Sequence, residues 1–289
     1  MSTGWFGGLV SAGKYVVDAV CSKGETEDQC HQRLKVIRNE GFDEEEKKNF
    51  DNALIKYEQS YCAGAGYKPA LIDIASIHQQ KALGLKTEIY DSTNKKLDYH
   101  IQHEAKELFK LSIQLYERCI SELKEPKWQK YKWRAINDLS ILKKEGLVFN
   151  YKDGNKIEVV KGNIQEAIPL LLEAYIGNPE DISIIYNLGV FYYSYSTELE
   201  DHKKKEMLEE SKRYYEEFMR KSEDKVKNTE SEDYTWYTDH RDTTTKKLRE
   251  IDHLLGIHSK GGKSRVRKNK SRTRRNKSRK IKKRIRTKK

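Results

Sequence analysis

Past residue 43 the chain repeats a short pattern of small and large side chains at helical spacing. A small residue is followed after four positions by an aromatic residue or leucine, and after three more by a second small residue. The matches are Ala53, Tyr57 and Ser60; Ser112, Tyr116 and Cys119; Ala167, Leu171 and Ala174; and Ser211, Tyr215 and Phe218, where the last site is large. These offsets place the three side chains on one helix face. The pattern predicts helices whose small residues let a neighbouring helix approach closely.

A second helical pattern alternates with the first and reads apolar, two spacers, apolar, small. Its matches are Leu71, Ile74 and Ala75; Ile136, Leu139 and Ser140; and Ile185, Leu188 and Gly189. We expect Gly189, like Ala167 and Ala174, to face a neighbouring helix with no room for a larger side chain. The alternation predicts successive pairs of packed helices.

The combined pattern resembles the tetratricopeptide repeat (TPR) family. The clearest stretch runs from Gly162 to Tyr193, where Pro179 stands at the turn between two helices and Tyr192 follows Gly189 by three residues. The resemblance implies an all-α fold of antiparallel helix pairs, stacked as a short irregular TPR-like solenoid. Separations of 37, 27 and 22 residues occur where the family has about twelve, so we expect inserts. One insert carries Asp153-Gly154 between apolar runs, which predicts a small hairpin.

We predict four parts along the chain. Residues 1–42 form an N-terminal helical cap, 43–222 the TPR-like repeats with their inserts, 223–258 a C-terminal capping helix, and 259–289 a disordered polybasic tail. The apolar residues between Trp5 and Val20 either cover the end of the core or contact a membrane surface. No apolar run is long enough to span a membrane.

Charge divides the chain sharply. Residues 260–289 hold eighteen Lys or Arg and no Asp, Glu or aromatic residue, whereas the preceding residues hold 39 basic and 45 acidic side chains. Such a tail cannot collapse into a core. It either contacts nucleic acid without sequence preference, serves as a nuclear-import address, or adheres to another acidic partner. It resembles the basic tails of giant nucleocytoplasmic DNA virus proteins. The predicted polyanion-binding residues are Lys263, Arg265, Arg267, Lys268, Arg272, Arg274, Arg275, Lys282, Lys283 and Arg284.

Motifs for catalysis and for metal or cofactor binding are absent from the sequence. Phosphate-binding loops, metalloprotease helices and nucleophile elbows do not occur. His100 and His103 share a helix face near Glu104, but no third ligand lies within local reach, so we expect a solvated surface. We interpret the four cysteines as reduced thiols in a reducing compartment. The sequence therefore predicts an intracellular, non-enzymatic protein of the host cytoplasm or nucleus, or a virion component, with no metal and no cofactor.

The resemblance also implies a binding groove on the first helix of each pair. It assigns Ser183, Tyr186, Asn187, Val190 and Tyr193 on the best-matched helix; Arg134, Asn137, Asp138 and Ile141 on the middle helix; and Ile72, Asp73 and Ser76 before them. Asn187 stands where the family often binds a peptide backbone. Arg134 is the one basic residue in these sets, so capture of a C-terminal carboxylate by a basic clamp is not expected. Two hypotheses follow: a scaffold that binds a peptide or protein partner, or a nucleic-acid-associated protein acting through its tail.

Overall fold

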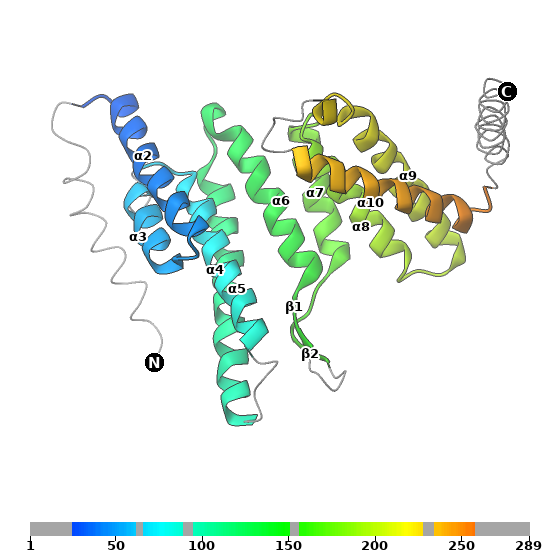
Figure 1. Cartoon of the computed structure of the whole chain (residues 1–289), viewed down its shortest axis with the longest axis horizontal. Coiled ribbons are helices and arrows are strands. Elements are labelled where there is room, and N and C mark those ends of the chain that lie inside the picture. The colour runs from blue at the N-terminus through cyan, green and yellow to red at the C-terminus, as the bar shows by residue number, and fades with distance from the viewer. Residues whose placement is uncertain (1–24, 62–65, 89–94, 151–155, 228–233, 258–289) are drawn as a thin grey trace, which may run out of the picture. The chain divides into compact units, whose positions relative to one another are not determined.

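The computed structural model describes residues 25–61, 66–88, 95–150, 156–227 and 234–257, and these residues are mostly helical (Figure 1). The elements in chain order are α2 (Glu27–Glu46), α3 (Phe50–Tyr61), α4 (Ala70–Glu88), α5 (Lys95–Glu122), η3 (Pro126–Trp128), α6 (Gln129–Glu145), β1 (Leu147–Asn150), β2 (Lys156–Val160), α7 (Ile164–Gly177), α8 (Ile182–Ser196), α9 (Asp201–Lys221), η4 (Lys225–Lys227) and α10 (Tyr234–Leu254). The all-α fold class is confirmed.

The helices pack in antiparallel pairs in chain order (Figure 1). Contacts join α2 to α3, α4 to α5, and α6 to α7 within pairs, and α3 to α4, α5 to α6, and α7 to α8 between pairs. The chain divides into two compact units between Phe218 and Met219. The first unit is therefore a short TPR-like stack in which each helix packs on its sequence neighbours.

Two glycines mark close approaches between paired helices. A Cβ atom on Gly189 of α8 would lie 2.6 Å from the ring of Tyr215 in α9, and one on Gly41 of α2 would lie 2.5 Å from the ring of Tyr57 in α3. Real Cβ atoms do not approach ring carbons this closely, so only glycine fits without a shift of the ring or of the helices. The prediction for Gly189 is confirmed, and Ala167 and Ala174 are both fully buried.

The first helix pair has a regular spacing that our sequence analysis missed. Gly41 precedes Ala53 by twelve residues, the family's separation, whereas the later pairs carry the inserts. Helix α2 runs unbroken through the predicted boundary at residues 42 and 43 and packs against α3. We therefore place α2 with the first helix pair rather than in a separate cap.

Buried serine hydroxyls tie two of the pairs together at equivalent positions. Ser112 Oγ of α5 donates to the carbonyl oxygen of Ala75 in α4 at 2.8 Å, and Ser211 Oγ of α9 donates to that of Gly189 in α8 at 2.8 Å. All four residues are the small residues of the two sequence patterns. The recurrence of one hydrogen bond two pairs apart is direct structural support for a repeat.

The inserts fold locally. Strands β1 and β2 pair antiparallel, with Phe149 opposite Ile157, which confirms the predicted hairpin; Asp153-Gly154 lies outside the described residues. Pro179 stands in the turn between α7 and α8, as predicted. Asn163 caps the N-terminus of α7, and Asp181 caps that of α8, each accepting two backbone N–H bonds.

The second unit begins at Met219 and includes α10, a helix that the sequence also predicts. Arg241 Nη1 donates to the Met219 carbonyl oxygen at 2.5 Å and to Ser222 Oγ at 2.8 Å. These bonds fix α10 against the end of α9. Gly256, with φ of 68°, follows the helix in the left-handed conformation that favours glycine.

One sequence expectation about the cysteines is wrong. Cys30 is disulfide-bonded, so the interpretation of all four cysteines as reduced thiols does not hold for it. Cys119 is a free and fully buried thiol, as expected. The predicted N-terminal apolar helix and the polybasic tail both lie outside the described residues. Among the helices that are described, none is long and apolar enough to cross a membrane.

Candidate binding face on the first helices

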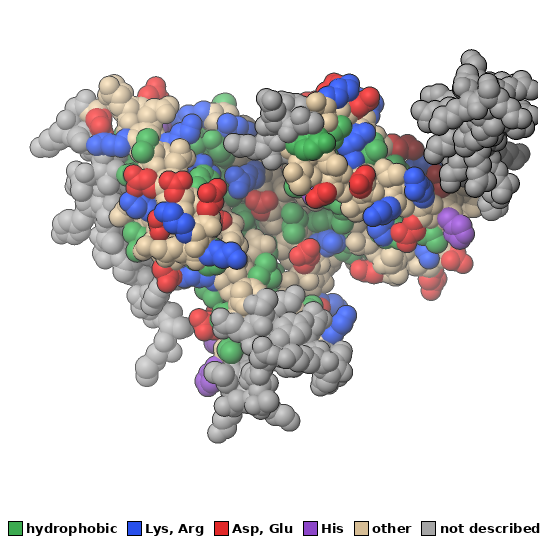
Figure 2. Space-filling view, in the orientation of Figure 1, with side chains coloured by type: hydrophobic (Ala, Val, Ile, Leu, Met, Phe, Trp, Pro, Cys, Tyr) green, Lys and Arg blue, Asp and Glu red, His purple; other side chains and the backbone are tan. Residues whose placement is uncertain are grey.

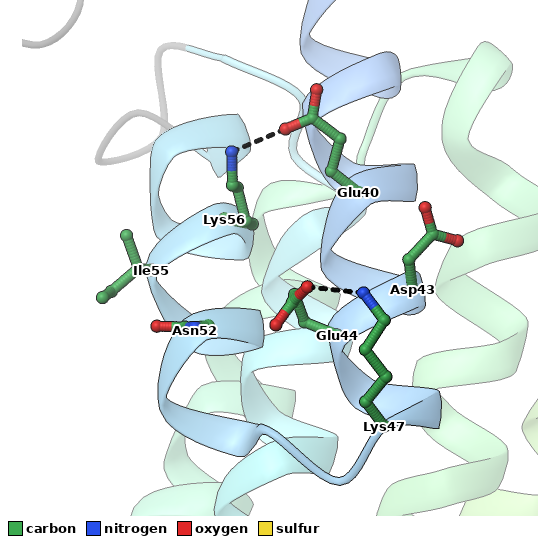
Figure 3. Close-up of a pocket in the computed structure, with 7 residues that line it drawn as sticks. All are labelled: Glu40, Asp43, Glu44, Lys47, Asn52, Ile55 and Lys56. Carbon is green, nitrogen blue, oxygen red and sulfur yellow. Dashed lines mark hydrogen bonds and ion pairs between the residues drawn. The ribbon is translucent and has the colours of Figure 1, made fainter.

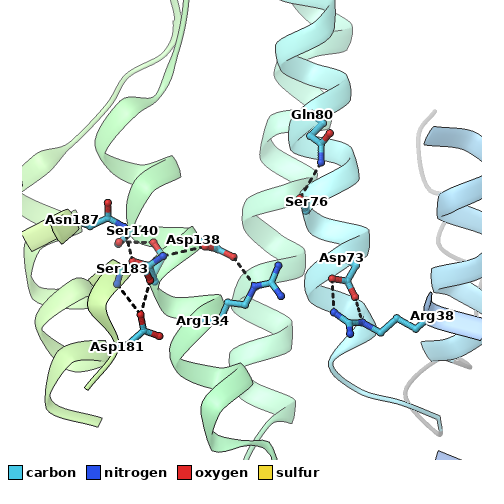
Figure 4. A network of polar contacts seen from close by, with 11 residues as sticks. Arg38, Asp73, Ser76, Gln80, Arg134, Asp138, Ser140, Asp181, Ser183 and Asn187 are labelled. Atoms are coloured by element: carbon cyan, nitrogen blue, oxygen red, sulfur yellow. Dashed lines mark hydrogen bonds and ion pairs between the residues drawn. The ribbon is translucent and has the colours of Figure 1, made fainter. Parts of the chain in front are cut away.

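A polar network joins α6 to α8 at the predicted groove residues (Figure 4). Asn187 Nδ2 of α8 donates to Asn137 Oδ1 of α6 at 2.9 Å, and Asn137 Nδ2 donates to Asp138 Oδ1 at 3.1 Å. Arg134 Nε lies 3.8 Å from Asp138 Oδ2. The structure thus brings together Arg134, Asn137 and Asn187, together with Asp138. We call these four residues the α6–α8 network.

Ser183, another predicted groove residue, belongs to the cap of α8. Its hydroxyl donates to Asp181 Oδ1 at 2.6 Å, and its backbone N–H donates to the same oxygen at 3.0 Å (Figure 4). Asp181 is held as a charged N-cap, where the helix dipole favours a carboxylate.

Tyr186, one aromatic member of the predicted set, packs against α9. The ring of Tyr186 lies 5.1 Å from that of Phe218 in α9, measured between centroids. Val190, Tyr193 and Tyr186 are each half-buried, so part of each side chain remains accessible. Replacing Tyr186 would therefore disturb the contact with α9 as well as any partner.

The earlier part of the face is closed by a buried ion pair that sequence reasoning missed. Arg38 of α2 donates through Nη2 to Asp73 Oδ1 of α4 at 2.9 Å, and through Nε to Oδ2, and the two side chains are 8% and 2% exposed. Burial raises the pKa of the Asp73 carboxyl, and the hydrogen bonds from Arg38 oppose that rise. Asp73 and the neighbouring Ile72 are buried, while Ser76 is half-buried. This end of the predicted groove therefore offers few accessible side chains to a ligand.

Asp138 differs from Asp73 because its negative charge is only partly balanced by a neighbouring cation and a hydrogen-bond donor. Burial raises the pKa of its carboxyl to about 6, and the charge of Arg134 and the hydrogen bond from Asn137 only partly oppose that rise. The side chain is nevertheless 26% exposed, and that of Arg134 is 49% exposed. Asp138 is therefore a carboxylate that solvent can reach at the edge of a poorly solvated site.

A hollow of about 460 Å³ lies between α2 and α3 (Figure 3). Its charges are largely satisfied from within, since Lys47 Nζ lies 2.8 Å from Glu44 Oε1 and Lys56 Nζ lies 2.6 Å from Glu40 Oε2. Ile55 is the one apolar residue in its lining. Figure 2 shows acidic and basic side chains interspersed over α2 and α3. The hollow has the character of a solvated surface rather than of a ligand pocket.

The remaining candidate chemistry is sparse. Among the residues that the structure describes, no group of three His, Cys, Asp or Glu side chains could hold a metal ion. His100 and His103 are exposed on α5, in agreement with a solvated surface. The ten predicted polyanion-binding residues of the tail lie outside the described ranges.

Comparison with known proteins gives a weak and purely structural likeness. No family model matches the sequence, and no curated protein matches it. A crystal structure of MamA protein aligns with 81% of this chain and 97% of its own length, at 15% identity and a TM-score of 0.32. A computationally designed self-assembling cyclic homo-oligomer aligns with 86% of this chain and 95% of its own, at 14% identity and a TM-score of 0.26. The assignment of the fold rests on the packing of this chain's own helices.

Proposed function

We propose that the protein is a non-enzymatic scaffold that binds a peptide or protein segment on the face formed by α6 and α8. The α6–α8 network carries this proposal. It consists of two amide side chains, a carboxylate and a guanidinium from two helices, linked by polar contacts. Asn187 uses one amide hydrogen on Asn137 and keeps a second hydrogen and its carbonyl oxygen for a ligand. Groups of this kind can bond the backbone of an extended peptide while neighbouring side chains supply specificity.

The test compares Asn187→Ala with the matched variant Asn39→Ala, which lies in an exposed part of α2. Full-length proteins treated with nuclease serve as bait, and the bound proteins are identified by mass spectrometry. We expect Asn187→Ala to lose partners that the parent and Asn39→Ala retain, with unchanged circular dichroism. Equal recovery by all three would move the binding surface away from α8.

A second candidate function belongs to the tail, and its composition favours it. Eighteen positive charges in thirty residues without acidic members suit phosphate contacts or an import receptor. On this proposal the protein is intracellular, in the cytoplasm or nucleus, and associates with nucleic acid. A scrambled tail that binds DNA normally but fails to enter nuclei would identify the tail as an address.

A further inference from the structure

The first helices of consecutive pairs meet through equivalent residues, and this equivalence isolates Asp138. Each first helix has one small residue of the second sequence pattern, and positions are counted back from it. The residue three positions before the small residue of one first helix pairs with the residue two positions before the small residue of the next first helix. Arg38 and Asp73 meet in this way between α2 and α4, and Asn137 and Asn187 between α6 and α8. Both steps are closed by hydrogen bonds within the protein.

Between α4 and α6, the residues at these equivalent positions form no such hydrogen bond. The corresponding residues there are Ile72 and Asp138, and an isoleucine can neither donate a hydrogen bond nor neutralise a charge. Within the described residues, Asp138 Oδ1 accepts one hydrogen bond, from Asn137, while Oδ2 has Arg134 Nε at 3.8 Å, beyond hydrogen-bonding distance. One carboxylate oxygen of this step is therefore open.

The surroundings of Asp138 favour a cation at that oxygen. Asp73 of α4, itself paired with Arg38, and Asp181 at the cap of α8 both disfavour the Asp138 charge, and Tyr116 of α5 also lies within its field. Arg134 is the facing cation, and half of its side chain is in solvent. An incoming ammonium or guanidinium would add the attraction that Arg38 provides to Asp73, at a site where the low dielectric strengthens it.

We propose that Asp138 is a specificity residue for a lysine or arginine side chain of the bound peptide, received between α4 and α6. This inference rests on the proposed binding function and names the chemistry of the partner: a basic segment rather than an acidic one. The inserted cation would complete the row of contacts that the protein closes by itself at the other two steps. An anionic or apolar residue at the same place would leave Oδ2 without a donor.

The experiment begins with the full-length protein, freed of nucleic acid, and a library of ten-residue peptides. Each peptide has a central lysine flanked by random uncharged residues, and a second library carries acetyl-lysine instead. The best retained peptide is then synthesised in both forms, and its Kd is measured for the parent, for Asp138→Asn and for Asp201→Asn. Asp201 is an exposed residue of α9 and controls for the loss of one charge.

We expect acetylation to weaken binding to the parent and to Asp201→Asn about tenfold or more, and binding to Asp138→Asn less than twofold. The preference of the parent for lysine should shrink as the pH falls from 7.5 to 5, because the Asp138 carboxyl becomes neutral over that range, and Asp138→Asn should show no such change. Asparagine has the same shape and can still accept from Asn137, so thermal melts of Asp138→Asn should match or exceed those of the parent.

An equal effect of acetylation in the parent and in Asp138→Asn would overturn the assignment. If peptides are retained without regard to the central lysine but are lost in Asn187→Ala, the binding face stands and Asp138 has no role in it. If neither library is retained at millimolar concentration, the cation subsite and the proposed peptide binding on this face both fail.

Discussion

At the scale of single residues, side-chain size and burial affect the stability of the fold more than charge does. The surface ion pairs contribute little each, because solvent screens them. In contrast, the ring of Tyr215 occupies the space that a side chain at position 189 would need. Asp138 is the opposite case, a residue whose environment disfavours its own charged form. The proposed cation subsite depends on this perturbed carboxylate.

The glycine contact gives a test with an internal control. Gly189→Ala should lower the free energy of unfolding by about 1–3 kcal/mol, because the added methyl overlaps the Tyr215 ring and the helices must move apart. Gly84→Ala, in α4 with no atom within 4 Å of the new Cβ, should raise it by up to about 1 kcal/mol through the gain in helix propensity. Urea denaturation followed by circular dichroism measures both. A Gly189→Ala variant as stable as Gly84→Ala would contradict the described contact between α8 and α9.

At the scale of elements, the serine–carbonyl bonds define how a pair is held. We expect Ser112→Ala and Ser211→Ala each to lower the free energy of unfolding by about 1 kcal/mol, since a buried hydrogen bond is lost while the carbonyl keeps its helical partner. Ser121→Ala removes an exposed hydroxyl bond within α5 and should change stability by less than about 0.5 kcal/mol. Chemical denaturation of the three variants decides the matter. Equal effects at buried and exposed sites would mean that these bonds do not hold the pairs.

The sequence predicted the later helix pairs because their small and large residues recur at fixed offsets. It missed the first helix of the first pair because Glu40 stands where the later first helices have Ile74, Leu139 and Leu188, which hides the pattern around Gly41. It also placed Asn137 and Asn187 on one face but could not pair them. Contacts such as Arg38 with Asp73 depend on how successive helices stack, and no local spacing encodes that. The distance between Gly41 and Ala53 was the one signal available for α2.

At the scale of the whole molecule, the chain separates its charge. Residues 1–259 carry a net charge of −6 and the last thirty residues +18. The proposed binding of a basic peptide and the proposed binding of a polyanion therefore belong to different parts of one chain. The two proposed activities have opposite charge requirements, so deletion of the tail should abolish polyanion binding without changing the charge of the α6–α8 network.

The salt dependence of DNA binding tests this division. If the tail neutralises about eight phosphates on duplex DNA, the logarithm of the association constant should fall with the logarithm of salt concentration at a slope near −7, from roughly −0.9 per contact. Scrambling residues 263–289 should leave affinity and slope unchanged, because phosphate contacts carry no sequence information. Deleting those residues should leave negligible affinity, since the remaining body is acidic. Fluorescence anisotropy with a labelled duplex measures all three proteins. Tight binding that survives the deletion would assign nucleic-acid binding to the helical body instead of the tail.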